Sequence, residues 1–465
     1  MRREPNGFIS LINKLDAIED GGCARHTRVI ISQELGNDTN HIQWNKGVRV
    51  KARKWFAAAA LIAVTAAGLV GCSSGTSSGS AKTLSFTEDK GWNYKPLSTA
   101  ANKDIGVSLK TSTYSNENQF QAFIKQSLRT PKAPDIFTWH TGSQLQQLVQ
   151  QGLVADTSSI WKKAIANKWV TPAIEKMYTV NGKQYCVPLE VDYWGMYYNK
   201  AIFAKYKLTP PTTWNQMLKD AAVLKSNGVT PFYSQGGNPW AFVWYMLTMA
   251  GTDLNTYNAL NAGKASYTDP QVKAAMNTWL GMLNKGYFSD PGSTTPTQTS
   301  FKDGQAAMQP FGTWYPGTLA TVNFKPGSDW GLFPIPAVKT QDGKTPVAVE
   351  TAPVCVTAKS SNKAAALKYA QWLMGPTAQS TWSKAQGILP YNPQAKAANS
   401  TLQAFGKQVT SSKYEAYLRY YEAAPAPVLT AALNNFTGFM ENPGDPTKYL
   451  QTIQAASAQY WATNK

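Results

Sequence analysis

The sequence predicts an α/β protein with more than one domain, and three observations lead to this fold class. The chain has 465 residues, more than one compact core usually holds, so we expect about two to four domain-sized units. Hydrophobic residues make up 43% and charged residues 15%, which indicates a globular rather than a disordered chain. After residue 81, segments of alternating apolar residues are interspersed with segments of helical spacing. This β-α-β-α order favours a mainly parallel sheet.

The individual elements follow from the spacing of apolar residues. Alternation predicts strands at 84–86 and 105–109, and helical spacing predicts a helix over 118–129. A third strand is expected at 135–137, and the next helix ends at Gly152. The later part contains an extended aromatic segment at 185–199 and helices expected at 213–228, 239–250, 270–285, 363–374, 412–421 and 446–461. No internal repeat is visible, which argues against a solenoid.

A secretory signal is predicted at residues 48–71. Basic residues between Arg49 and Lys54 precede an apolar run from Trp55 to Val70. This run is about 16 residues long, shorter than the roughly 20 that span a bilayer comfortably, although an uncleaved anchor is the alternative. Its end, Leu69-Val70-Gly71-Cys72, resembles the bacterial lipobox, so we expect cleavage before Cys72 and lipidation of its thiol. Residues 72–81 are rich in Gly and Ser and predict a flexible tether, with the body of the protein outside the cytoplasm.

Residues 1–47 precede a complete signal, and we interpret them as a wrongly assigned upstream extension or a disordered segment.

The formal net charge of the chain is +18, which raises the question of nucleic-acid binding. However, no dense basic run follows residue 54, and nucleic-acid binding usually shows clustered Lys and Arg or a known motif. We therefore expect no nucleic-acid partner. Diffuse positive charge is consistent with a protein held near an anionic envelope.

Several short segments between residues 82 and 395 occur in a fixed order. They are Ala133-Pro134-Asp135-Ile136, Gly152 to Asp156, Asn181 to Pro188, Tyr197-Tyr198-Asn199-Lys200, Pro211 to Trp214, Phe301 to Met308 with Gly312 and Trp314, Trp330 to Pro336, Ala364 to Leu373, and Gly387-Ile388-Leu389-Pro390. Each segment alone is weak. Together and in this order they resemble the family of extracellular solute-binding proteins that includes the maltose-binding protein.

The resemblance implies a periplasmic-binding-protein-like (type II) fold, with two α/β lobes, crossover hinge strands and a ligand cleft between the lobes. The first lobe would hold residues 82–190 plus 352–395, and the second 191–351 plus 396–465. It further implies a monomer that captures a sugar, expected to be a di- or oligosaccharide, and delivers it to the permease subunits of an ABC transporter. Hinge closure on the ligand is the expected motion.

A sugar site needs aromatic faces for stacking and converging hydrogen-bonding groups. Candidates are taken from the ends of the predicted strands and from the two crossovers, where ligands bind in such folds. They are Glu88, Asp89, Trp92, Trp139, His140, Asp192, Tyr193, Trp194, Trp240, Trp314, Tyr315, Glu350 and Tyr391. Asp89, Asp192 and Glu350 could accept hydrogen bonds from sugar hydroxyls; the alternative for each is a capping or ion-paired acid.

For any one tryptophan, core packing is the alternative to ligand binding. Trp194, Trp240 and Trp314 lie at chain bends and are preferred as ligand contacts. The remaining periodic tryptophans, Trp214, Trp279 and Trp372, are assigned to the core because they lie on apolar helix faces.

No enzymatic, metal or cofactor chemistry is expected. His140 is the only histidine after the signal, and no His/Cys cluster has zinc-ligand spacing. No Gly-x-x-x-x-Gly-Lys motif is present, so the ATPase would be another chain. A surface glycosidase, which needs two opposed carboxylates, remains the alternative class, together with a sugar sensor or adhesin that does not serve transport.

Two cysteines, Cys186 and Cys355, lie in the body of the chain. An exported protein is in an oxidising compartment, where such a pair often forms a disulfide. By the resemblance, the two belong to neighbouring strands of one lobe near the hinge. The alternative is two small buried hydrophobic side chains, and the sequence leaves both possibilities open.

Overall fold

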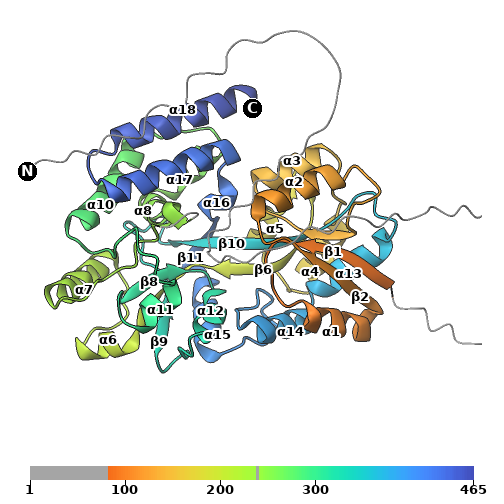
Figure 1. Ribbon diagram of the computed structural model, residues 1–465, viewed down its shortest axis with the longest axis horizontal. Coiled ribbons are helices and arrows are strands. Elements are labelled where there is room, and N and C mark those ends of the chain that lie inside the picture. Colours follow the sequence, from red (N-terminus) through yellow and green to blue (C-terminus); the bar gives the residue numbers. More distant parts are fainter. Residues whose placement is uncertain (1–81, 237–239, 465) are drawn as a thin grey trace, which may run out of the picture. The chain divides into compact units, whose positions relative to one another are not determined.

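The computed structural model describes residues 82–236 and 240–464, and these form two lobes with separate hydrophobic cores. The first lobe is built on a six-stranded sheet (Figure 1). Its strands are β1 (Lys82–Glu88), β2 (Val107–Thr113), β3 (Ile136–Thr138), β6 (Val187–Tyr193), β10 (Thr345–Val356) and β11 (Tyr414–Leu418). The strand order is β11-β10-β3-β1-β2, and β6 pairs with β10.

The predicted parallel core of this sheet is present. β1 lies between β2 and β3 and runs parallel to both, with Leu84 opposite Leu109 and Phe86 opposite Ile136. β10 runs antiparallel to β3 and β6, so the sheet as a whole is mixed. The second strand begins at Val107 and not at 105, because the preceding helix continues to Ile105 and ends at Gly106, whose φ of 67° suits a glycine.

Helices cover both faces of this sheet. Asn116 caps one of them, since its side chain accepts a hydrogen bond from the backbone N–H of Gln119, and prolines begin several others, as is common at a first helical turn. The helices are α1 (Lys95–Ile105), α2 (Glu117–Ser127), α3 (Ser143–Gln150), α4 (Ser158–Ala166), α5 (Pro172–Met177), α13 (Lys363–Leu373) and α14 (Pro376–Gln386). The hairpin of β4 (Thr179–Val180) and β5 (Lys183–Gln184) precedes β6.

The second lobe has an antiparallel sheet in the order β8-β7-β9, formed by β8 (Met308–Phe311), β7 (Gly195–Asn199) and β9 (Trp330–Phe333). Its other elements are mostly helical. They are α6 (Lys200–Lys205), α7 (Trp214–Ser226), the short η1 (Trp240–Phe242), α8 (Val243–Thr252), α9 (Leu254–Asn261), α10 (Pro270–Asn284), α11 (Thr297–Lys302), α12 (Tyr315–Ala320), α16 (Tyr420–Ala423), α17 (Ala426–Glu441) and α18 (Thr447–Thr463). A further helix, α15 (Ser400–Val409), contacts both lobes.

Two predictions about particular segments need correction. The helix expected at 412–421 is wrong: residues 414–418 form β11, because they pair in parallel with the first half of β10, and α16 begins only at Tyr420. Trp372 is not a full core residue, because it is half-buried and its indole N–H donates to Asp104 at 3.0 Å. Trp214 and Trp279 are buried in the second core as expected.

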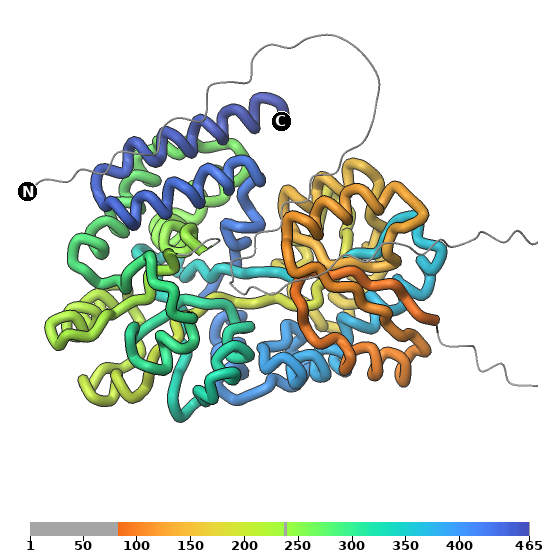
Figure 2. Tube along the Cα trace, viewed as in Figure 1, coloured from red at the N-terminus to blue at the C-terminus, as the bar shows by residue number. Residues whose placement is uncertain are grey.

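The chain passes between the lobes at β6–β7, along β10, and after α14 (Figure 2). Tyr193, at the end of β6, packs in the first core, whereas the next residue, Trp194, packs in the second. Inside β10, Val349 belongs to the first core and Ala348 to the second. β6 and β10 are therefore continuous with both lobes, as hinge strands must be.

One boundary differs from the expected division of the chain. Residues 396–465 were assigned to the second lobe, but Leu402, Phe405 and Val409 of α15 pack in the first core. Phe405 also lies against Gly195 of β7, so α15 contacts both lobes. An amphipathic helix at a crossover can bury one face against two neighbours, which its sequence alone does not reveal.

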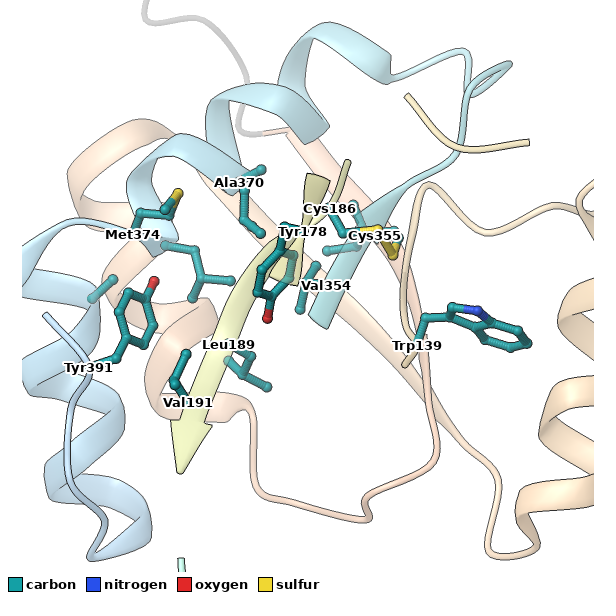
Figure 3. Close-up of a cluster of buried hydrophobic side chains, with 14 of the residues drawn as sticks. Trp139, Tyr178, Cys186, Leu189, Val191, Val354, Cys355, Ala370, Met374 and Tyr391 are labelled. Carbon is teal, nitrogen blue, oxygen red and sulfur yellow. A yellow bond between two sulfur atoms is a disulfide. The ribbon is translucent and has the colours of Figure 1, made fainter. Parts of the chain in front are cut away.

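Cys186 and Cys355 are joined by a disulfide in the structure, with their Cα atoms 4.1 Å apart (Figure 3). Both side chains are fully buried in the first core, beside Tyr178 and Val354. The carbonyl of Cys186 also accepts a hydrogen bond from the indole N–H of Trp161 at 2.9 Å. The crosslink ties the start of β6 to the end of β10, within the first lobe.

Cys72, the signal at 48–71 and the tether at 72–81 lie outside the described residues. Among the residues that are described, no helix combines the length and the apolar character needed to cross a membrane.

Candidate ligand-binding site

Three of the predicted tryptophans converge on one carboxylate beside the hinge strands. We call Trp194, Trp240 and Trp314 the tryptophan cluster. The indole N–H groups of Trp194 and Trp314 both donate to the same oxygen of Glu350, at 3.2 and 2.8 Å. The ring of Trp240 lies 6.1 Å from that of Trp194 and 5.8 Å from that of Trp314. Residues far apart in the sequence therefore form one aromatic cluster around an acid on β10. Trp240 and Trp314 are half-buried, whereas Trp194 is 1% exposed and supports the other two from within the second core.

Arg419, which was not among the residues predicted from the sequence, is the cation of this site. Its guanidinium lies 2.9 Å from the Glu350 carboxylate and donates to both oxygens of Glu422. The same group lies 5.8 Å from the rings of Trp194 and Trp240. Burial alone would lower the pKa of Arg419, but the carboxylates of Glu350 and Glu422 outweigh burial and raise it, so the guanidinium stays charged.

Two further acids lie on β6, opposite β10. Asp192 pairs with Glu350 in the strand register and accepts a hydrogen bond from the Thr313 hydroxyl at 2.9 Å. Glu190 accepts one from the indole of Trp382 at 2.6 Å. Burial raises the pKa of Glu190 to about 8, and the charge of Glu350 adds to the shift. The pKa of Asp192 is also raised, first by burial and then by the neighbouring charges of Glu190 and Glu350.

The first lobe contributes the loop after β1. Glu88 holds this loop in place, since it accepts hydrogen bonds from the backbone N–H groups of Lys90 and Gly91 at 2.7 and 2.9 Å. Asp89 accepts one from Thr138 at 2.7 Å and lies 3.0 Å from the Lys90 ammonium. Burial would lower the pKa of Lys90, but Asp89 and the more distant Glu117 and Glu350 raise it. Glu88 therefore shapes the loop, and Asp89 positions a cation.

A hydrogen-bonded contact joins the two lobes next to this loop. Glu117, at the start of α2, accepts hydrogen bonds from the Tyr421 hydroxyl at 3.0 and 2.9 Å, and Tyr421 belongs to α16 of the second lobe. Nε2 of His140 lies 3.0 Å from the same carboxylate. Burial raises the pKa of Glu117, but His140, Lys90 and Tyr421 together lower it to about 2. A cavity of about 360 Å³ lies beside this contact, lined from both lobes by residues that include Asn118 and Asn434.

Several other predicted ligand residues are taken up by packing. Trp139 is 2% exposed and lies among Phe120 and Phe137 in the first core, whereas its neighbour His140 contacts Glu117 (Figure 3 shows Trp139). Trp92 packs on Trp382 with ring centroids 5.8 Å apart and lines a separate surface cavity of about 340 Å³.

The three tyrosines of the prediction are also buried. Tyr315 stacks on Phe311 at 4.0 Å and donates to Gln309. The hydroxyl of Tyr391 donates to the carbonyl of Pro188 at 3.1 Å. Burial raises the pKa of Tyr193 to about 12. In this structure these side chains serve the cores and are not presented to a ligand.

Six charged or aromatic residues of the site were not predicted from the sequence: Lys90, Glu117, Glu190, Arg419, Tyr421 and Glu422. Arg419 and Tyr421 lie within the segment 412–421, which was expected to be a helix, and Glu422 follows it directly. One signal was available, because Arg129 and Arg419 are the only arginines after residue 72, and Arg419 is followed by two tyrosines. An arginine in an aromatic setting often forms a cation–π or bidentate contact.

The arrangement offers aromatic faces, a buried cation and several acceptors, which suits a neutral polyhydroxylated ligand. Within residues 82–236 and 240–464, no group of three or more His, Cys, Asp or Glu side chains is placed to hold a metal ion.

Comparisons with known proteins agree with this fold. The chain is 26% identical over 347 residues to an uncharacterized ABC transporter extracellular-binding protein of Pyrococcus horikoshii. This alignment covers 72% of this chain and 76% of that protein. It is also 25% identical over 268 residues to a multiple sugar-binding protein of Streptococcus mutans, in an alignment that covers 55% of this chain and 61% of that protein. Among solved structures, a chitin oligosaccharide binding protein superimposes with a TM-score of 0.69 at 18% identity, covering 82% of this chain and 100% of the other, and so shares the fold.

These likenesses confirm the predicted two-lobe α/β fold. The model of the bacterial extracellular solute-binding protein family matches residues 75–380, about two thirds of the sequence. The chain therefore belongs to the bacterial extracellular solute-binding protein family.

Proposed function

We propose that this protein binds a sugar, a di- or oligosaccharide, and delivers it to the permease subunits of an ABC transporter. The observation that carries the proposal is the tryptophan cluster around Glu350. Sugar rings have apolar faces that pack on indoles, and their hydroxyls need donors and acceptors fixed nearby. Glu350, Arg419 and Asp192 supply these groups next to the strands that cross between the lobes.

The position of Glu350 also suits a protein that closes on its ligand. Glu350 lies on β10, which connects the lobes, and it holds two indoles and a guanidinium of the second lobe. From the first lobe, Lys90 lies close enough to Glu350 to feel its charge, and Glu117 accepts hydrogen bonds from Tyr421 of the second lobe. A ligand that contacts both sets would stabilise the closed arrangement through its preference for that state.

The proposal includes export, anchoring and the absence of catalysis. We propose that the protein acts outside the cytoplasm as a monomer, lipidated at Cys72, and that the sugar is released unchanged. The names of its relatives, an ABC transporter extracellular-binding protein and a multiple sugar-binding protein, support the transport role. A glycosidase would instead release shortened products from the same ligand.

A thermal-shift screen over mono-, di- and oligosaccharides, followed by calorimetry, tests this function. A ligand present at 100 times its dissociation constant should stabilise the protein by about 2.7 kcal/mol. Chromatography of the recovered ligand then distinguishes capture from hydrolysis. Stoichiometric binding with unchanged sugar supports the proposal, whereas shortened products, or no response to any sugar alongside a response to another class of solute, would contradict it.

A further inference from the structure

The first lobe carries a strongly basic face formed by three neighbouring helices. α13 lies between α4 and α1, because Lys163 of α4 donates to Gln371 at 3.0 Å and Lys368 of α13 donates to the carbonyl of Ile105 at 2.9 Å (Figure 1). Five exposed lysines lie on these helices, and two more lie shortly after α4 and shortly before α13. We call these seven the basic face: Lys103, Lys162, Lys163, Lys168, Lys359, Lys363 and Lys368. The one acidic residue in these three helices, Asp104, accepts the indole N–H of Trp372.

The described chain begins beside this face. The backbone N–H of Lys82 donates to the carbonyl of Gly106 at 2.9 Å, next to the Ile105 carbonyl that Lys368 contacts. Lys82 itself is exposed and adds another positive charge. The 81 residues that precede the described structure therefore join the fold at the edge of the basic face.

The candidate binding site lies at the other end of the same strands. Lys82 begins β1, whereas Glu88 ends it and is followed by Asp89 and Lys90 of the cleft loop. Seven residues of extended chain separate the two ends, about 20 Å at the rise of a β-strand. A surface that binds the basic face therefore leaves the cleft loop free.

We propose that the basic face rests on an anionic lipid bilayer. Lysines on a helical surface within a Debye length of anionic headgroups are attracted to them, and the attraction adds up over several side chains. The site of chain entry favours a bilayer over other anionic partners. This choice rests on the lipidation of Cys72 proposed above. A tether of ten residues from Cys72 to Ala81 spans about 35 Å at most, which would keep Lys82 and its surroundings near the membrane. The attraction does not depend on lipidation, because it arises from the side chains of the folded lobe.

The test uses the chain from residue 72 onward with Cys72→Ser, which keeps every described residue and removes the acyl acceptor. One variant carries Lys103→Gln, Lys162→Gln, Lys359→Gln and Lys363→Gln. The matched control carries four exposed lysines of other elements as glutamine: Lys219→Gln, Lys264→Gln, Lys339→Gln and Lys407→Gln. Both variants lower the net charge by the same amount.

Co-sedimentation with phosphatidylglycerol-rich and pure phosphatidylcholine vesicles gives the readout. We expect binding to the anionic vesicles that weakens with salt, a fall of about tenfold or more in the partition coefficient for the basic-face variant, and a fall below about twofold for the control. Equal losses in both variants would mean that net charge alone matters and would overturn the proposal. So would equal binding of the parent chain to both kinds of vesicle. Sugar titration of the same samples reports on the proposed function separately, and it should be unaffected by either set of substitutions.

Discussion

Removal of the Cys186–Cys355 crosslink should lower the stability of the protein substantially. The two cysteines are 169 positions apart, so the bond closes a long loop in the unfolded chain. The chain-entropy model gives about 5 kcal/mol for a loop of this length, near the top of the range seen when native disulfides are removed. Both side chains are fully buried, so alanine is a better replacement than serine, which would bury an unsatisfied hydroxyl.

Guanidinium unfolding measures this effect. The oxidised protein, the same protein refolded under reducing conditions, and the Cys186→Ala/Cys355→Ala variant are compared with and without reductant. We expect the loss of about 4–5 kcal/mol in both forms that lack the bond, and a steeper denaturant dependence because an uncrosslinked chain exposes more surface. Reductant should leave the double variant unchanged, which is the internal control. Two thiols that react with Ellman's reagent in the unfolded, unreduced protein would refute the reasoning, as would a midpoint that does not respond to reduction.

Three further predictions concern the site and the leader. Alanine at any position of the tryptophan cluster should raise the sugar dissociation constant by about 30-fold, whereas Trp372→Ala, a half-buried control in the first lobe, should leave it unchanged in calorimetry; normal binding by all three variants would mean that the site lies elsewhere. Because burial raises the pKa of Glu190 to about 8, its contribution to stability should be complete below about pH 4.5 and lost as the pH rises through 8. Glu190→Gln should flatten this decline in thermal unfolding, and an unchanged pH profile would argue against it. Mass spectrometry of the exported protein should find an acylated Cys72 at the N-terminus, and an unmodified Cys72 or peptides from residues 1–47 would contradict that expectation.

The fold was predictable mainly where one element is determined by local spacing. β1 and α2 alternate or repeat their apolar residues regularly, so their types and positions follow from the sequence. β11 was mistaken for a helix because its residues, Tyr414 to Leu418, become a strand only through pairing with β10. That partner lies about 70 positions earlier in the chain, beyond the reach of any local pattern.

The candidate site was predictable in part, for a related reason. Trp194 and Glu350 were predicted because they lie at the chain crossovers, and Trp314 because it lies at a chain bend. The structure brings both indoles within hydrogen-bonding distance of Glu350. Tyr315 and Tyr391 look similar in sequence, but each hydroxyl finds an acceptor inside the protein. Whether an aromatic side chain faces inward depends on the neighbouring element, and the sequence does not identify that neighbour.

The order in which the first lobe is assembled has a consequence for its biogenesis. Its sheet is incomplete without β10, and its helices α13 and α14 pack on strands that are synthesised much earlier. Just before α13, for example, the Ser360 hydroxyl donates a hydrogen bond to Asp135, which lies 225 positions earlier in the sequence. Closing such long loops is slow, and the lobe cannot be completed until most of the chain has been synthesised. A nascent chain of this protein therefore stays unfolded in its first lobe during synthesis. A translocation channel that transports unfolded chains can accept this state, whereas an N-terminal domain that folds on its own would block it.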